Sequence, residues 1–141
     1  MSSTARVTLE INAPIEKVWD ALTKPEIVKQ YFFGTDLITD WQVGSDIVFA
    51  GEWQGQRYED KGKVLEVTPQ TKISYSYWSS VGGTENKPEN YNNISYELQS
   101  TEPGKTTLTV IQEGCKDEES RKHSEDNWTG VLKGMKEMLE G

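Results

Sequence analysis

The chain has 141 residues and a formal net charge of −8 at pH 7, with a sequence pI near 4.7. This length can bury a core without metal or disulfide support, and we expect a single domain over residues 1–141. The acidic balance argues against binding to nucleic acid or to an anionic membrane surface.

The cysteine content and the N-terminus bear on the cellular compartment. Cys115 is the only cysteine and cannot form an internal disulfide, which is compatible with a reducing compartment. The N-terminal MSSTARVTLEINAP has no basic segment followed by a long apolar one, so we expect no signal peptide. No apolar run approaches the roughly 20 residues that span a bilayer. We therefore expect a cytoplasmic protein.

The first part of the chain predicts one strand and two short helices. Val7, Leu9 and Ile11 alternate with polar residues, the pattern of a half-buried strand. Pro14 takes a first helical position before IEKVWDALT, and Pro25 opens a second helix, EIVKQYFF, that ends at Gly34.

From Thr35 onward the apolar residues recur with a period of two, which is typical of strands. Turns rich in Gly and Pro separate the strands and indicate antiparallel neighbours. The polar segment SSVGGTENKPENYNN, residues 79–93, is longer than a hairpin needs and is expected to form a mobile surface rim. The strands are expected near residues 36–41, 46–53, 57–68, 72–78, 92–100 and 106–112.

The last stretch, DEESRKHSEDNWTGVLKGMKEMLEG, predicts a long amphipathic helix over about residues 118–139. Asp117 is a candidate N-cap. This is the only predicted element long enough to cover an antiparallel sheet. We therefore expect an α+β helix-grip architecture, in which a curved antiparallel sheet of about seven strands wraps around the C-terminal helix and the two short helices close one end. The apolar stripe of this helix consists of Trp128, Val131, Leu132, Met135, Met138 and Leu139.

Several segments together resemble the START-like (Bet v 1-like) superfamily, and within it the family of the activator of the Hsp90 ATPase. They are INAPIEKVWDALTKPEIVKQYF, DWQVGSDIVF, GKVLEVTPQTKISYSYW, TTLTVIQEG and NWTGVLKGMKEMLE, in the family's order over nearly the whole chain. Two features depart from the family's pattern: Asn127-Trp128 where members often have Gly-Trp, and the long segment 79–93. The fold hosts carriers, cyclases, receptors and co-chaperones, so the resemblance alone does not define a function.

The strand alternation predicts which side chains face the C-terminal helix, and these admit two interpretations. They form either a packed aromatic core or the lining of a cavity for a small apolar molecule. The resemblance implies a cavity and favours the second interpretation. The candidate ligand-binding residues are Phe49, Trp53, Tyr75, Tyr77, Tyr96, Leu98, Trp128, Leu132 and Met135.

The helical stripe continued backwards from Trp128 meets Arg121, Ser124 and Glu125. A charged side chain there either reaches water past the sheet edge, which is the usual case, or points into the cavity mouth. In the second case Arg121 would be a polar anchor for an anionic ligand group.

The inventory for catalysis is small, and we expect no catalytic residue, no metal and no cofactor. His123 is the only histidine and lies off the apolar stripe, so a zinc cluster of Cys and His or a histidine-based triad is excluded. Cys115 is expected to be a buried inert thiol. No Gly-rich phosphate loop is present in the sequence.

Three hypotheses remain, in this order. The first is a monomeric carrier or sensor of a small apolar or aromatic molecule. The second is a co-chaperone-like partner of an Hsp90-type ATPase, and the third is an enzyme of the cyclase or hydrolase kind that uses the same cavity. The sequence does not name the ligand.

Overall fold

The computed structural model describes residues 3–31, 34–53, 55–78, 85, 87, 91–115 and 117–140. Seven strands and three helices follow one another in the predicted order. They are β1 (Ser3–Ile11), α1 (Ile15–Thr23), α2 (Pro25–Tyr31), β2 (Asp36–Ile38), β3 (Asp46–Trp53), β4 (Gln56–Thr68), β5 (Lys72–Tyr77), β6 (Asn92–Glu102), β7 (Lys105–Cys115) and α3 (Glu118–Glu140).

The strands form one antiparallel sheet in the order β1-β7-β6-β5-β4-β3-β2. Strands that follow each other in sequence are neighbours from β2 to β7, because short turns join most of them. β1 closes the order on the far side of β7, so the first strand of the chain pairs with the last one.

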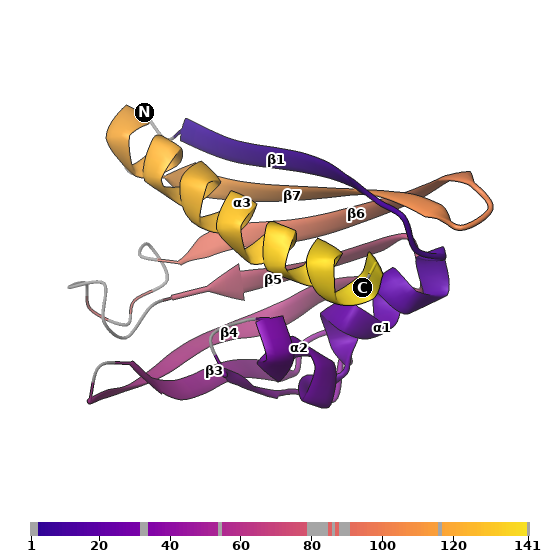
Figure 1. Ribbon diagram of the computed structural model, residues 1–141. Helices are drawn as coiled ribbons and strands as arrows, with labels where there is room; N and C mark the ends of the chain where they lie inside the picture. The colour runs from indigo at the N-terminus through magenta and orange to yellow at the C-terminus, as the bar shows by residue number, and fades with distance from the viewer. Residues whose placement is uncertain are drawn as a thin grey trace.

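The helix α3 lies across the concave face of the curved sheet, and α1 and α2 close the end at which α3 finishes (Figure 1). The apolar stripe of α3 is buried at Trp128, Val131, Leu132 and Met135, as the helical periodicity predicts. Asp117 accepts a hydrogen bond from the Ser120 N–H at 2.8 Å and caps the helix. The helix-grip architecture is confirmed.

The strand predicted over residues 36–41 is too long, since β2 ends at Ile38. Polar side chains of neighbouring residues accept hydrogen bonds from the backbone there. Thr39 Oγ1 accepts from the Trp41 N–H at 3.2 Å, and Asp40 Oδ1 accepts from the Gln42 N–H at 3.0 Å. Trp41 turns the chain with a φ of 59°. These side-chain hydrogen bonds compete with the sheet ladder and end the strand.

The ladder between β4 and β5 is interrupted at Gly62, between the pair of Val64 with Tyr75 and the isolated bridge of Lys61 with Trp78. A Cβ atom built on Gly62 would lie 1.7 Å from the Ser76 carbonyl oxygen, so the two backbones approach closely only because this residue is glycine. The Lys63 N–H donates to Ser76 Oγ at 2.9 Å instead of continuing a regular ladder. Beyond this point a bulge lies between Val64 and Glu66.

Two predictions fall outside the described residues. The predicted rim of residues 79–93 is described only at Glu85, Lys87 and Tyr91–Asn93, and the last residues of the second predicted helix, Phe32 and Phe33, are not described. Among the helices that are described, none combines the length and apolar character needed to cross a lipid bilayer.

Candidate functional site

Four aromatic side chains form a continuous cluster between the sheet and α3; we call Phe49, Tyr75, Tyr96 and Trp128 the aromatic cluster. The ring centroids of Phe49 and Tyr75 are 5.6 Å apart, those of Tyr75 and Tyr96 are 5.6 Å apart, and those of Tyr96 and Trp128 are 5.9 Å apart. Their exposed fractions range from 1% for Tyr75 to 7% for Trp128. Such tilted and edge-on contacts are favourable for aromatic pairs beyond the area that they bury.

Strand alternation brings three members of the cluster together. In the β5–β6 register Tyr75 lies opposite Ile94 and Ile73 lies opposite Tyr96, so all four side chains share the concave face. Phe49 comes from β3 on the same face, and α3 supplies Trp128 from above. The periodicity of the sequence therefore predicts the face of each element on which these residues lie.

The other predicted ligand-binding residues fall into three groups. Leu98, Leu132 and Met135 are buried in the same core as the cluster. Tyr77 is half-buried, and its ring lies 5.9 Å from that of Phe49. Trp53 ends β3, and its side chain lies outside the described part of the structure.

At the centre of the aromatic cluster the hydroxyl groups of Tyr75 and Tyr96 form a hydrogen bond of 2.6 Å. Burial raises the pKa of both phenols well above the ordinary value of 10, so both are neutral at physiological pH. Two hydroxyls carry two O–H donors, and the bond between them uses one. Within the described residues neither hydroxyl makes a further hydrogen bond.

Polar side chains that the sequence analysis did not select also point to the concave face. Asp60 is 7% exposed and accepts a hydrogen bond from the Tyr77 hydroxyl. Gln112 Oε1 accepts from the Trp128 Nε1–H at 2.9 Å. Alternation along β4 was the available signal for Asp60, because it stands two residues before Gly62 and four before the buried Val64.

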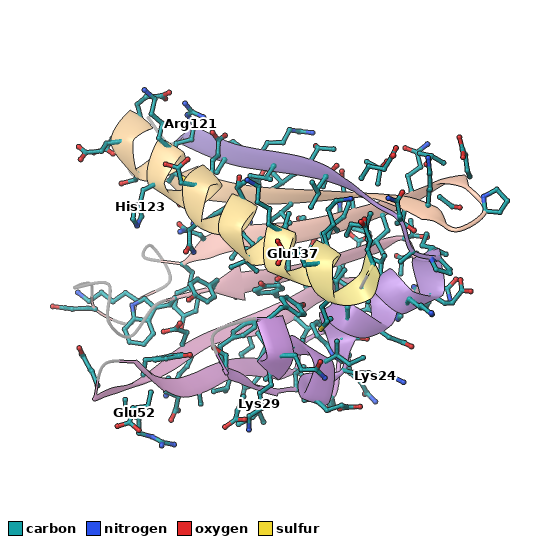
Figure 2. The ribbon with its side chains drawn as sticks, in the orientation of Figure 1. Lys24, Lys29, Glu52, Arg121, His123 and Glu137 are labelled. Carbon is teal, nitrogen blue, oxygen red and sulfur yellow. The ribbon has the colours of Figure 1, made fainter. Side chains whose placement is uncertain are left out.

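The predicted polar anchor Arg121 lies at the start of α3 beside β1, with His123 on the other side of the helix (Figure 2). Arg121 is 23% exposed, and its guanidinium pairs with Glu118 and with Glu125, the latter at 2.7 Å. Both carboxylates hold the pKa of the guanidinium above its ordinary value. Its charge is thus already engaged by two neighbours on its own helix.

Two open hollows lie on the opposite, outer face of the sheet. One, of about 600 Å³, is lined by polar side chains that include Arg6, Lys72 and Ser95. The other, of about 930 Å³, lies beside Gly62 and is lined by Lys61, Lys63 and Tyr91 among others. Both hollows are separate from the aromatic cluster.

In the part of the chain that the structure describes, no group of three or more His, Cys, Asp or Glu residues could hold a metal ion. His123 is exposed, whereas Cys115 is buried with its Sγ 3.7 Å from the Gln112 carbonyl oxygen.

The sheet order, the two short helices and the long C-terminal helix over an aromatic interior define a START-like, helix-grip protein. The family model of the activator of Hsp90 ATPase homolog 1-like proteins matches residues 12–140. The chain belongs to this family.

Solved structures of similar chains agree with this assignment. The solution structure of ChR145 from Cytophaga hutchinsonii is 44% identical, with a TM-score of 0.85 over 98% of this chain and 94% of that chain. The crystal structure of MLL2253 from Mesorhizobium loti is 22% identical, with a TM-score of 0.78 over 98% of this chain and 97% of that one. The Aha1 dimer from Colwellia psychrerythraea is 21% identical, with a TM-score of 0.76 over 98% and 96% of the two chains. The two more distant structures support the fold alone. A search of curated proteins found no match.

Proposed function

We propose that this protein binds a small apolar or aromatic molecule between the sheet and α3, as a carrier or sensor. The observation that carries the proposal is the hydroxyl pair of Tyr75 and Tyr96, buried within the aromatic cluster and hydrogen-bonded to each other at 2.6 Å. Aromatic walls with a few placed polar groups are the usual lining of a small-molecule site.

The hydrogen-bond count supports this proposal. One O–H of the pair has no acceptor within the described residues, and leaving a buried donor unsatisfied costs about 1–3 kcal/mol. A core that served stability alone would gain from phenylalanine at both of these positions, which would remove the unsatisfied donor. An oxygen or nitrogen acceptor on a bound molecule would use the spare donor, and the rings would stack against its apolar part.

The test is an NMR titration of the protein with planar apolar compounds that carry one carbonyl or ether oxygen. The signals of Tyr75, Tyr96, Trp128 and Met135 should shift together and saturate, because these side chains share one interior. Exposed residues such as His123 should not follow them. If only surface signals move across the compound series, the proposal is wrong.

Two variants sharpen this experiment. Leu132→Trp replaces a side chain that is buried against the sheet by a larger indole. It should abolish binding by filling the proposed ligand site between the sheet and α3. His123→Ala is the control, since an exposed histidine has no neighbour in the aromatic cluster, and binding should stay within about two-fold. A 100-fold loss of any identified turnover in His123→Ala would instead indicate general acid–base catalysis.

A second candidate function is a co-chaperone-like partnership with an Hsp90-type ATPase. The match of the family model over residues 12–140 favours it. The test is the ATP hydrolysis rate of a purified Hsp90-type chaperone with and without this protein. A several-fold, saturable stimulation would support the partnership, and an unchanged rate across the titration would contradict it.

A further inference from the structure

The strand β1 is the last strand of the sheet, and among the described strands it pairs only with β7. An edge strand presents a row of N–H and C=O groups that can pair with another chain. Because the hydrogen-bonding direction alternates along an antiparallel ladder, Arg6, Thr8 and Glu10 turn these groups to the same side, away from β7. We call this side the β1 edge.

Three side chains of α3 occupy the β1 edge. Glu125 Oε2 accepts from the Arg6 backbone N–H at 3.1 Å. Lys136 Nζ donates to the Glu10 carbonyl oxygen at 2.9 Å. Glu140 Oε2 accepts from the N–H of Asn12, the residue after β1, at 2.8 Å. Side chains of the helix thus take the place of a neighbouring strand.

The dimensions of the two elements explain how one helix reaches both ends of the strand. α3 runs beside β1 in the same direction (Figure 1). From Glu125 to Glu140 the helix advances by about 22 Å, at roughly 1.5 Å per residue. From Arg6 to Asn12 the strand advances by about 20 Å, at roughly 3.3 Å per residue. The near match keeps both carboxylates in register with their N–H donors.

Ion pairs on α3 hold these side chains in position. Glu125 pairs with Arg121 at 2.7 Å, and Arg121 also pairs with Glu118. Glu140 pairs with Lys136 one turn before it. On the strand, the carboxylate of Glu10 lies 4.0 Å from the Lys105 ammonium.

We infer that Glu125, Lys136 and Glu140 cap the β1 edge against strand addition, and that an uncapped β1 pairs with β1 of a second copy of this chain. The β1 sequence fits itself in antiparallel orientation. Pairing centred on Thr8 places Arg6 opposite Glu10 of the second copy, and the two-fold symmetry repeats the contact. The Arg6 guanidinium has no hydrogen bond or ion pair within the described residues, so it is available for this contact.

The test compares the double variant Glu125→Ala and Glu140→Ala with a matched control, Asp126→Ala and Glu137→Ala. Both pairs remove two negative charges from α3, and alanine keeps the helix propensity high. Asp126 and Glu137 are exposed, and Glu137 lies on the outward side of the helix (Figure 2). In sedimentation at pH 7 the cap variant should dimerise at least ten-fold more tightly than the wild type or the control. A cap variant that stays as monomeric as the control would overturn the inference.

The position of the interface is tested by charge reversal in the cap variant. Adding Arg6→Glu places like charges opposite each other and should return the protein to monomers. Adding Glu10→Arg as well should restore the dimer, because the reversed pair is again complementary. If neither change alters dimerisation, the dimer uses another surface and the β1 pairing is contradicted.

The wild type offers a readout that does not depend on the variants folding. The pKa of Glu125 lies below its ordinary value of 4.5, mainly because its carboxylate accepts a hydrogen bond from the Arg6 N–H. The hydrogen bond and charge of Arg121 lower it further, whereas burial and the charge of Glu118 oppose the shift. The Asn12 N–H and then Lys136 lower the pKa of Glu140 in the same way. Lowered pKa values mean that the cap is intact above pH 4.5 and is lost as the pH falls below it.

In amide hydrogen exchange, the Arg6 and Asn12 amides should lose protection below pH 4.5, while the Val7 amide in the β1–β7 ladder stays protected. Acid also weakens the contact of Arg6 with Glu10 of the second copy, so dimerisation is measured at pH 7 and the acid experiment tests the cap alone. Arg6 and Asn12 amides that stay protected below pH 4.5 would contradict the capping role of Glu125 and Glu140. Because no ligand is added, the outcome is independent of the proposed binding function.

Discussion

A double-mutant cycle measures the contribution of the hydrogen bond between Tyr75 and Tyr96 to the free energy of unfolding. Tyr75→Phe or Tyr96→Phe alone should destabilise the protein by about 1–2 kcal/mol, because the remaining buried hydroxyl loses its partner. The double variant should be less destabilised than either single one, since neither polar group remains. Denaturant unfolding of the four proteins measures this coupling. Additive losses would show that the two hydroxyls do not depend on each other.

The close approach of β4 and β5 predicts a large effect of one methyl group. Gly62→Ala should destabilise the protein by about 3 kcal/mol or more, because its Cβ would collide with the Ser76 backbone carbonyl, which cannot rotate away. Gly130→Ala on α3 is the matched control. Nothing lies within 4 Å of a Cβ there, and alanine should stabilise the helix by about 0.5–1 kcal/mol. Equal effects of the two substitutions would mean that the strands can separate at little cost.

The helix α3 depends on its apolar face for its place on the sheet. A 23-residue helix with glycines at positions 130 and 134 has weak intrinsic propensity and needs tertiary packing. Leu132→Ala should cost about 2–5 kcal/mol, because Leu132 is 1% exposed and its removal leaves a cavity. Lys133→Ala next to it is exposed and should change the unfolding free energy by less than about 0.5 kcal/mol. Similar losses of unfolding free energy in both variants would mean that the face of α3 that carries Leu132 is not the one packed on the sheet.

The molecule as a whole should lose stability at alkaline pH. Burial raises the pKa of Tyr31, Tyr75 and Tyr96 above 10 in the folded protein, with smaller contributions from neighbouring tyrosines. Unfolded tyrosines ionise near pH 10, so the unfolded chain releases protons that the folded one retains. The stabilising contribution is therefore complete below pH 10 and declines as the pH rises above it.

Unfolding free energies measured from pH 8 to 12, together with tyrosinate absorbance, test this expectation. These three phenols should ionise only as the protein unfolds. In the Tyr75→Phe and Tyr96→Phe double variant the decline above pH 10 should be shallower. A wild type whose tyrosines all ionise near pH 10 without unfolding would contradict the burial of these hydroxyls.

Local patterns in the sequence determined the order of the elements, the antiparallel pairing and the apolar face of α3. Each rests on a repeat of two or 3.6 residues that neighbouring side chains carry. The same alternation placed Tyr75 and Tyr96 on the concave face. The premature end of β2 depended on Thr39 and Asp40 hydrogen bonds, which compete with strand pairing and which the alternation of apolar residues does not reveal.

Only the tertiary structure decided which polar groups meet. The bond from the Arg6 N–H to Glu125 joins residues 119 positions apart, and the bond from the Asn12 N–H to Glu140 joins residues 128 apart. Periodicity specifies the face on which a side chain lies but not the partner that approaches it from another element. Glu125 lies on the predicted stripe near Arg121, where the sequence allowed either solvent or a cavity mouth, and the structure places it against the backbone of β1. The cause is the relative position of α3 and β1, which the packing of the whole apolar core sets.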